Sequence, residues 1–471
     1  MPSKKYVDLK LRMGLMGLHY KVSLNNWLYA GAGMYTAITG DQGGLFALGI
    51  ALGATQKLYK NLYLDANFNF GGGGGYRYLV NDGAYINPNV GLQYKAVNYS
   101  FGMQFSRFDF YSGQIKSNSL SFFVQIPSIF RFYNHSKAHQ RFKHKNLTFD
   151  NLEKRTAKKN VQQLRFDFFQ PIGNSKKDNG TKLSETLYAL GFEFQKYTGE
   201  KTFLFIHTDA VYKGLRAGFM DLFFGVGYLA FQSKYFNLFG KLGLGAAGGR
   251  IEPEGGLTLY PSTGLDIKVS NKIVLSTHSG YYRAVAGNFE AYTWGFGLKY
   301  QSLNFKEATF NKYTYISKGI SLGLENQSYF KVAKTDNLNA VLLVDLQLLA
   351  LLYNYELNKN VYLTSEAGFA YAGKSGGYAQ GLVGIGFASS YLAKNKVRVF
   401  ISLTGGVAGG AGVDTGEGLI VKPTTGFDYI LAQNFSIKTS VGKLYAPFGK
   451  VNSYNINIGI SFSFATLNII K

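Results

Sequence analysis

The final strand-like segment of the chain alternates between apolar and polar residues without a break. Every second residue from Tyr454 to Phe464 is aromatic or isoleucine, and the residues between them are asparagine, glycine or serine. A period of two with one apolar and one polar face is typical of a β-strand that lies between hydrocarbon and water. The same alternation recurs along the chain and predicts a transmembrane β-barrel rather than a soluble enzyme.

The composition agrees with membrane-spanning strands and excludes membrane-spanning helices. Aromatic residues make up 16% of the 471 residues, with 39 Phe and 35 Tyr, and 58 Gly stand against 8 Pro. Phe and Tyr favour half-buried pleated surfaces, and Tyr also suits the membrane–water boundary. The nearest helix candidate, 340–353, contains Asp345 and Gln347 and is shorter than the roughly 20 residues that a spanning helix needs.

The chain contains no Cys, which excludes disulfides and thiolate metal sites, and no cofactor is predicted. Residues 1–20 carry no signal peptide, because charged side chains interrupt any apolar core. These charged residues are Lys4, Lys5, Asp8, Lys10 and Arg12. We therefore expect the numbered chain to be a mature form from which a leader has been removed.

The formal net charge is +23, and part of it is concentrated in one inserted loop, 131–163. Such a loop is expected to be solvated. The sharper alternative is contact with anionic lipid headgroups or with an acidic partner at the membrane surface. The basic residues of the loop are Arg131, Lys137, Arg141, Lys143, Lys145, Lys154, Arg155, Lys158 and Lys159.

A short proline motif occurs three times, each time after a cluster of glycines. The motif is Pro-x-x-Gly followed by Leu or Phe and then Gln or Asp, and its copies are Pro88–Gly91, Pro261–Gly264 and Pro423–Gly426. The glycine clusters cover 71–75, 245–249 and 405–412. The joint match predicts three internal repeats, at about 6–130, 164–303 and 312–466, within a single β-barrel domain, 1–471.

Each repeat contains seven or eight strand-like stretches, and the first repeat lacks the first of them. In the second repeat the strands are expected to begin near Leu164, Glu185, Lys201, Ala217, Phe236, Gly256, Lys272 and Glu290. With about 20 residues per strand and turn, the chain holds about 22–24 strands.

The fold class is therefore all-β, a transmembrane antiparallel β-barrel of about 22–24 strands. The alternative is three eight-stranded barrels in series, each with its interior filled by side chains. We favour the single ring, because the second repeat runs into the third within about ten residues and a ring leaves no unpaired edge in lipid.

The alternation also assigns charged side chains to the barrel lumen. The candidates lie on polar faces or near strand ends: Asp65, Lys95, Asp266, Lys268, Arg283, Asp428 and Lys443. Rings of Lys and Arg favour anions, so the excess of basic residues predicts an electropositive lumen. The alternative is that these residues hydrate the interior wall and pair with one another.

On these strands the chain resembles the outer-membrane β-barrel proteins of Gram-negative bacteria. The resemblance is one of architecture, covers most of the chain and includes a last strand that ends in an aromatic residue, Phe464. Such proteins usually finish at that aromatic, whereas this chain continues to Lys471. The resemblance implies a multi-pass protein of the cell outer membrane, surrounded by membrane lipids.

Catalytic patterns are weak, and we expect no enzyme. Ser276 and His278 share a strand face, as do His207 and Asp209. The outer-membrane phospholipases have the order His-x-Ser, the reverse of the first pair, and no residue that could orient the base is evident. Neighbours on one strand face also lie nearly 7 Å apart.

Metal and nucleic-acid sites are not predicted. The basic loop contains His135, His139 and His144, but no carboxylates stand at matching spacing to complete a metal site. Nucleic-acid binding would depend on charge alone, because the Tyr and Phe residues are already committed to strand faces.

The sequence predicts an outer-membrane channel, either porin-like or a partner-gated conduit for translocation or export. A ring of this width needs a plug, which the basic loop or a partner protein could supply. The alternative from another class is a scaffold barrel that anchors an envelope complex. A lipid-modifying barrel enzyme, using Ser276 and His278, is the third hypothesis.

Overall fold

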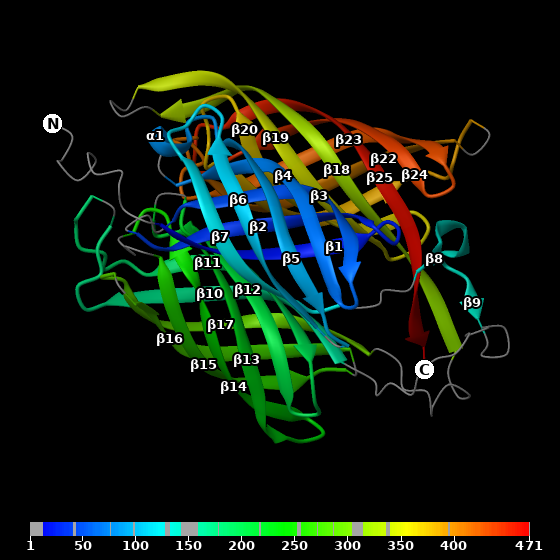
Figure 1. The fold of residues 1–471 in the computed structure, drawn as a ribbon, viewed down its shortest axis with the longest axis horizontal. Helices are drawn as coiled ribbons and strands as arrows, with labels where there is room; N and C mark the ends of the chain where they lie inside the picture. The colour runs from blue at the N-terminus through cyan, green and yellow to red at the C-terminus, as the bar shows by residue number, and fades with distance from the viewer. Residues whose placement is uncertain are drawn as a thin grey trace. The chain divides into compact units, whose positions relative to one another are not determined.

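The computed structural model describes most of the chain, and most of the described residues lie in β-strands or in the turns between them (Figure 1). The described residues are 13–40, 44–75, 77–97, 99–127, 132–142, 159–177, 179–215, 218–251, 256–270, 272–285, 287–303, 314–335, 340–393 and 396–470. Among them, no helix has the length and apolar character needed to cross a bilayer.

The first sheet contains seven strands in the order β1 to β7 and is open. Its strands are β1 (Gly14–Ser23), β2 (Leu28–Thr39), β3 (Phe46–Tyr59), β4 (Leu62–Gly74), β5 (Ala84–Lys95), β6 (Ser100–Phe110) and β7 (Lys116–Gln125). A short helix, α1 (Arg77–Val80), lies between β4 and β5.

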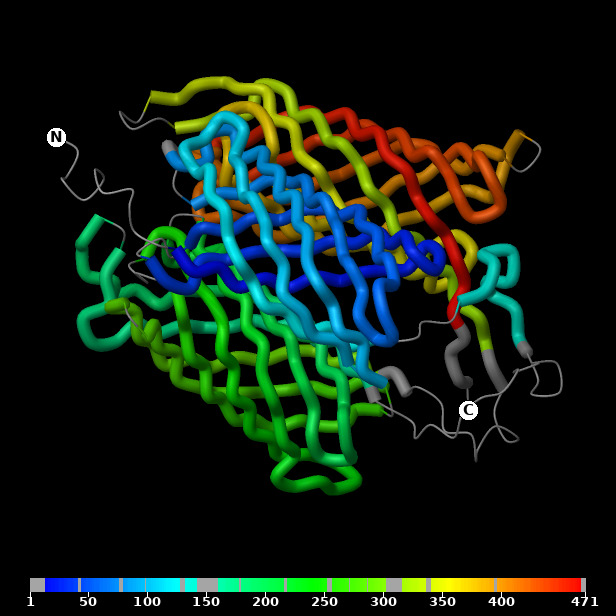
Figure 2. The backbone as a smooth tube through the Cα atoms, viewed as in Figure 1, coloured from blue at the N-terminus to red at the C-terminus, as the bar shows by residue number. Residues whose placement is uncertain are grey.

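The second sheet is a closed barrel of eight strands, in which β10 pairs with both β11 and β17. Figure 2 traces its wall in green. The strands are β10 (Lys159–Ile172), β11 (Leu187–Tyr197), β12 (Thr202–Lys213), β13 (Met220–Gln232), β14 (Phe236–Gly248), β15 (Leu257–Lys268), β16 (Ile273–Ala284) and β17 (Glu290–Leu303). We call it the central barrel.

The third sheet also closes over eight strands, because β25 pairs with β18. The strands of this C-terminal barrel are β18 (Thr314–Thr335), β19 (Val341–Glu356), β20 (Val361–Ala372), β21 (Ala379–Ala388), β22 (Val397–Gly409), β23 (Leu419–Ala432), β24 (Phe435–Tyr445) and β25 (Asn452–Ile470). Two short strands, β8 (Tyr133–Asn134) and β9 (Arg141–Phe142), pair with β25 and β18, and a 3₁₀ turn, η2 (His135–Lys137), lies between them.

The chain divides into two compact units. One is built around the central barrel, and the other contains the C-terminal barrel and most of the seven-stranded sheet.

The closure follows the alternative of eight-stranded barrels in series and not the favoured single ring. The reason lies in the first strand of each closed barrel: β10 pairs antiparallel with its own repeat's last strand, and β18 does the same with β25. An eight-stranded ring is just wide enough for side chains to fill its interior. The sequence count of strands stands, since the sheets contain seven, eight and eight long strands.

The eight strand starts expected in the second repeat match β10 to β17 within a few residues. The first repeat has seven strands, as the sequence indicated, and this sheet is the one that stays open.

The alternating faces are present as predicted. On β25 the outward Ile458 is 58% exposed, whereas the inward Asn455 and Asn457 are each 1% exposed. On β15 the outward Ile267 is 46% exposed and the inward Thr258 is fully buried. Apolar side chains on the outside and polar side chains on the inside are the arrangement of a barrel in lipid.

The motif prolines interrupt one ladder at the same place in all three sheets. Neither Pro261 nor the residue before it pairs across to β16, and Pro88 and Pro423 leave the same gap toward β6 and β24. On the other side each proline position stays in register, opposite Leu242 in the case of Pro261. Proline has no N–H to donate, which explains the gap in this ladder.

Candidate functional site in the barrel interiors

The interior of the central barrel is organised around Arg165 on β10. This side chain is completely buried. Its Nε lies 2.8 Å from Asp167 Oδ2, and its Nη1 lies 2.7 Å from Glu193 Oε2 on β11. A guanidinium presents several N–H groups in a fixed plane, so it can join carboxylates from different strands.

Two lysines complete the charge pairing in this interior. Lys241 Nζ on β14 lies 2.6 Å from Glu193, and Lys299 Nζ on β17 lies 2.8 Å from Asp266 on β15. All of these side chains are at least nine-tenths buried. Removing one partner from such a pair leaves an uncompensated buried charge, which is strongly destabilising.

A second group of polar side chains, His207, Asp209 and Asp221, lies in the same interior. His207 Nε2 and Asp209 Oδ2 on β12 lie 2.6 Å apart, and the backbone N–H of Asp209 donates to Asp221 Oδ1 over 2.8 Å. The neighbouring strand β11 has glycine opposite Asp209, and any side chain at Gly191 would collide with the carboxylate of Asp209. Glycine is therefore required there for a close approach.

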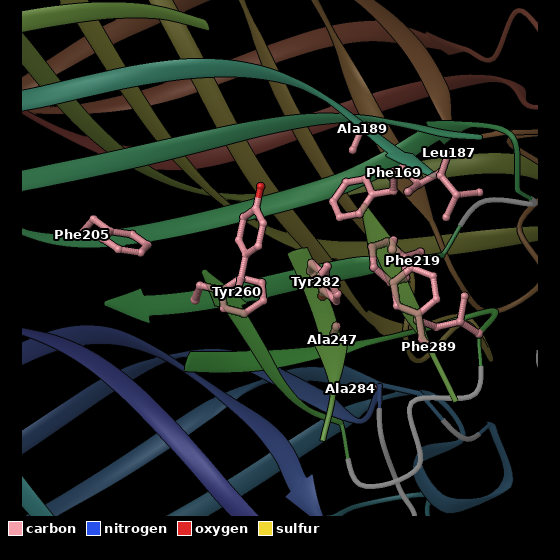
Figure 3. Packing of buried hydrophobic residues seen from close by; sticks show 14 of the residues in the cluster. Phe169, Leu187, Ala189, Phe205, Phe219, Ala247, Tyr260, Tyr282, Ala284 and Phe289 are labelled. Atoms are coloured by element: carbon pink, nitrogen blue, oxygen red, sulfur yellow. The ribbon is translucent and has the colours of Figure 1, made fainter. Parts of the chain in front are cut away.

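Aromatic rings fill the interior next to this polar network (Figure 3). Phe169 stacks edge-on against Tyr282 with 5.4 Å between ring centroids, and Tyr282 meets Phe289 at 5.5 Å. Phe219 lies 6.1 Å from Phe169 and 5.8 Å from Phe289. These rings are nearly or fully buried and pack against one another inside the barrel.

One set of side chains here has the composition of a metal site. Asp167, His207 and Asp209 each place a possible ligand atom within 4.8 Å of the others. Arg165 already donates to Asp167 and lies 4.0 Å from Asp209, so the guanidinium supplies the positive charge that a metal ion would bring. The set therefore reads as part of the ion-pair network.

The catalytic candidates Ser276 and His278 are enclosed in the same interior, with 1% and 5% exposure. His278 bonds to Asp167 and Arg165 and not to Ser276. His207 and Asp209 are likewise buried. A nucleophile needs a base within hydrogen-bond reach and access for a substrate. Ser276 Oγ makes no hydrogen bond to His278, and all four side chains are buried.

The C-terminal barrel has a different interior, centred on an ion pair between Lys422 on β23 and Glu366 on β20. The Lys422 Nζ lies 2.6 Å and 2.7 Å from the two Glu366 oxygens. Gln380 donates to Glu366 over 2.7 Å and to the Tyr329 hydroxyl over 2.9 Å. A cavity of about 20 Å³ adjoins this pair, enough room for a water molecule.

A larger cavity, of about 60 Å³, lies toward one end of the same barrel. Its lining includes Glu356, Arg398, Asp428 and Lys438. Arg398 Nη1 lies 3.3 Å from Glu356 Oε1, and Lys438 Nζ lies 3.5 Å from Glu325. Opposite charges therefore alternate around this wall.

Residues 133–142, which we call the cap segment, lie at this end of the barrel. His135 Nε2 lies 3.1 Å from Glu356 Oε1, and His139 Nε2 lies 2.8 Å from Glu356 Oε2. The backbone of Ser317 on β18 bonds to the segment in both directions, from His139 N–H and to the Gln140 carbonyl. The structure thus supplies a carboxylate for two of the loop histidines, and His144 lies outside the described residues.

The predicted lumen residues divide between the two faces of the walls. Asp65, Asp266 and Asp428 lie on interior faces, as do Lys95 on β5 and Lys268 on β15. Asp65 accepts from Tyr29, whereas Lys95 Nζ lies over the Tyr63 ring and Lys268 Nζ donates to the Ser233 carbonyl.

Two lumen assignments are wrong, because both side chains lie on outward faces of their strands. Arg283 is 59% exposed and pairs with Glu290. Lys443 extends over the ring of Tyr454, which is itself 67% exposed. Both lie at odd positions of strands whose inward residues are even, such as Ser276 and Ser440.

The basic loop is only partly described. Lys137 and Arg141 belong to the cap segment and are exposed, and the backbone of Lys159 begins β10. The other predicted residues of the loop, Arg131, Lys143, Lys145, Lys154, Arg155 and Lys158, lie outside the described residues.

The interiors described do not carry the expected excess of positive charge. In the central barrel five buried carboxylates stand against three buried Lys or Arg side chains. In the C-terminal barrel three buried carboxylates stand against three buried lysines. The alternative, that interior charges pair with one another, agrees with these contacts.

Sequence reasoning missed the residues at the centre of both networks. Arg165, Glu193, Glu366 and Lys422 were not among the lumen candidates. A signal for Arg165 was present, since Leu164 to Phe168 alternates strictly and places Arg165 and Asp167 on the polar face. Their partners on other strands require the register, which the alternation does not give.

No protein-family model matches this chain, and no curated protein matches it. Among solved structures, the chain is similar to the FrpB iron transporter from Neisseria meningitidis, with 8% identity, 97% of this chain and 80% of that chain covered, and a TM-score of 0.29. It is also similar to the outer membrane protein opdK from Pseudomonas aeruginosa, with 9% identity, 96% and 97% covered, and a TM-score of 0.26.

A smaller barrel, the outer membrane protein Ail of Yersinia pestis, shares 16% identity over 30% of this chain and 98% of its own, with a TM-score of 0.20. These scores lie far below 0.5, so the likenesses assign no function. The apolar outer faces and closed walls described above make the chain a multi-pass β-barrel protein of the outer-membrane type.

Proposed function

We propose that this protein is a scaffold barrel of the outer membrane, which anchors an envelope complex and does not conduct at rest. The observation that carries the proposal is the filling of the closed barrels. In the central barrel, the fully buried Arg165 joins Asp167 on its own strand, Glu193 on β11 and His278 on β16, and aromatic rings lie in the same interior. Eight strands leave little space beyond that which side chains fill.

The proposal includes no catalytic role for the buried Ser and His residues. Its partners are the surrounding lipids and an envelope protein that meets the exposed surface. Exposed basic side chains such as Lys137 and Arg141 suit an acidic partner or anionic headgroups.

Single-channel recording tests the proposal. Folded protein is inserted into planar bilayers, with folding verified by a heat-dependent shift in gel mobility. We expect no current steps from the folded protein. Stepwise currents that disappear with heat-unfolded protein would overturn the scaffold assignment.

A gated conduit is the second candidate, and the cap segment favours it. His135 lines the larger cavity of the C-terminal barrel, and both cap histidines bond to Glu356 at this end. A conduit closed by this segment would open when the segment leaves. Recording from a variant that lacks 133–142 separates the two candidates, because the scaffold proposal expects it to stay silent and the conduit requires current.

A further inference from the structure

The seven-stranded sheet has two edges, β1 and β7, each with one neighbour in the sheet among the described residues. In a bilayer an open edge leaves backbone N–H and C=O groups without water to bond. The edges of a membrane sheet therefore need a covering strand. This question concerns the open sheet alone and is independent of whether the closed barrels conduct.

The direction of the strands determines what can cover both edges. Strands β4 to β7 pair antiparallel, and β1 to β4 follow one another through short connections, so direction alternates along the sheet. With seven strands, β1 and β7 run the same way. A direct ladder between them would be parallel, and so would a ladder between edges of two copies inserted in the same orientation.

One strand that runs in the opposite direction pairs antiparallel with both edges. The closed barrels contain such a strand: β10 lies between β11 and β17, and β18 lies between β19 and β25, with antiparallel ladders on both sides.

The motif prolines show which strands correspond, because Pro88 lies on β5, Pro261 on β15 and Pro423 on β23. The hairpins that follow the matching strands agree. Leu24 N–H donates to the Leu28 carbonyl after β1, as Thr198 does to Thr202 after β11. Leu357 donates to Val361 in the same way after β19. The strands β1 to β7 therefore correspond to β11–β17 and β19–β25, and among the described residues no strand of this sheet corresponds to β10 and β18.

We propose that β1 and β7 receive one β-strand from a partner polypeptide, which closes the sheet as β10 and β18 close their barrels. The outward edge residues call for apolar neighbours. Phe122 on β7 is 79% exposed, compared with 51% for Phe296 on a paired strand, and Tyr20 on β1 is 63% exposed. The incoming strand covers them with apolar side chains at every second position.

The inward side of that strand is small and neutral. In the closed barrels its counterparts place Arg165 and Glu325 opposite Gly297 and Gly459. In the open sheet, the residue that corresponds to these two glycines is Phe123 on β7. Gln93 lies opposite Gly102, and Gly102 lies opposite Phe123. A ring stands where the barrels have glycine, so the partner residue opposite it must be small.

The sheet already carries its own interior charge pair. Lys21 Nζ on β1 lies 3.7 Å from Asp65 and 5.7 Å from the centroid of the Phe123 ring. A further basic side chain on the incoming strand would be buried without a carboxylate of its own, because Asp65 already pairs with Lys21. The two charged stretches of this chain, 1–12 and 143–158, carry several Lys and Arg residues each and do not match this requirement. A second polypeptide, rather than either of these stretches, is the occupant that we propose.

Site-specific photocrosslinking in the native membrane tests the proposal. Benzoylphenylalanine replaces Phe122 in one full-length variant and Tyr20 in another. We expect both to crosslink to the same short segment of one partner, a segment with alternating apolar and small polar residues. The matched control is Phe427 on β23, which is 46% exposed but paired on both sides, and it should give no such adduct.

Adducts to residues 1–12 or 143–158, to a second copy, or to unrelated segments from the two edges would overturn the proposal. Hydrogen exchange gives a second measurement if a variant fails to fold. In wild-type protein taken from its native membrane, amides of β1 and β7 should exchange several-fold more slowly than in protein refolded alone in lipid. The paired strands β6 and β23 should exchange alike in both samples. If the amides of β1 and β7 exchange at the same rate in both samples, the partner strand is also rejected.

Discussion

The two closed barrels have the same wall and different contents. Both close over eight strands and both carry a proline gap at the same rung of one ladder. The central barrel holds a hub, Arg165, whose guanidinium contacts groups from several strands. The C-terminal barrel holds separate lysine–carboxylate pairs, with cavities of about 20 and 60 Å³ beside them.

The difference shows that the wall and the filling are determined separately. Alternation of apolar and polar residues is enough to build the wall, whatever the inward side chains are. The filling determines how much a barrel depends on a single residue. A hub concentrates that dependence in one side chain, whereas separate pairs beside small cavities distribute it and leave room for water.

Replacement of the hub should have the largest effect. Arg165→Met removes the guanidinium, which leaves Asp167 without its arginine partner and Glu193 with Lys241 alone. We therefore expect a loss of about 3–5 kcal/mol in the free energy of unfolding. Denaturant unfolding in lipid vesicles measures it. Arg283→Met removes an exposed arginine of the same barrel and should change stability little. A loss below 1 kcal/mol for Arg165→Met would mean that this barrel has no hub.

The corresponding change in the C-terminal barrel should cost less. Lys422→Met leaves Glu366 with Gln380, and the adjoining cavity of about 20 Å³ offers water a place beside the carboxylate. We expect a loss of about 1–3 kcal/mol in the same unfolding assay. If this loss equals that of Arg165→Met, the contrast between hub and separate pairs fails.

The cap segment should respond to a smaller change. Glu356→Gln keeps the shape of the side chain but removes the negative charge that His135, His139 and Arg398 face. A partly exposed ion pair contributes about 1 kcal/mol, so trypsin should cut at Lys137 and Arg141 about fivefold faster. Glu200→Gln, in an exposed turn of the central barrel, serves as the control. Unchanged cleavage would show that the histidine contacts do not hold the segment.

The smallest effect is expected at the shared proline gap. Pro261→Ala and Pro423→Ala restore a backbone N–H at the same rung of the two barrels, and each should change stability by no more than about 0.5 kcal/mol. Paired measurement sharpens the comparison, since equal values mean that the walls are equivalent there. Opposite signs would show that the interior influences the wall.

Much of the wall could be predicted from the sequence. The alternation in 257–268 puts Thr258, Tyr260 and Asp266 on one face and Leu259 and Ile267 on the other, and the structure places the first set inward and the second outward. The reason is local, because successive side chains of a strand point to opposite sides. The same rule places Arg283 and Lys443 on outward faces. They were assigned to the lumen because the candidates included residues near strand ends without regard to their face.

Closure and the interior partners could not be predicted in this way. Whether β10 pairs with β17 or with a strand of another repeat depends on residues far apart in the chain. The alternation within one strand does not predict such a pairing. The contact of Arg165 with Glu193 depends on the same kind of register. Glu356 gave no signal either, since its histidine partners come from the inserted loop more than 200 residues earlier.

The length of the β18–β25 ladder has a mechanical consequence. It continues for sixteen rungs, from Tyr329 opposite Asn455 to Thr314 opposite Ile470, and at about 3.4 Å each these reach roughly 54 Å. A tilted strand crosses the hydrocarbon in about 9–11 residues, so part of this ribbon stands in water. A bare two-stranded ribbon is marginal there. Within the cap segment, β8 pairs with β25 and β9 pairs with β18. The cap segment therefore supports both edges of the ribbon and shares a force that is applied to it.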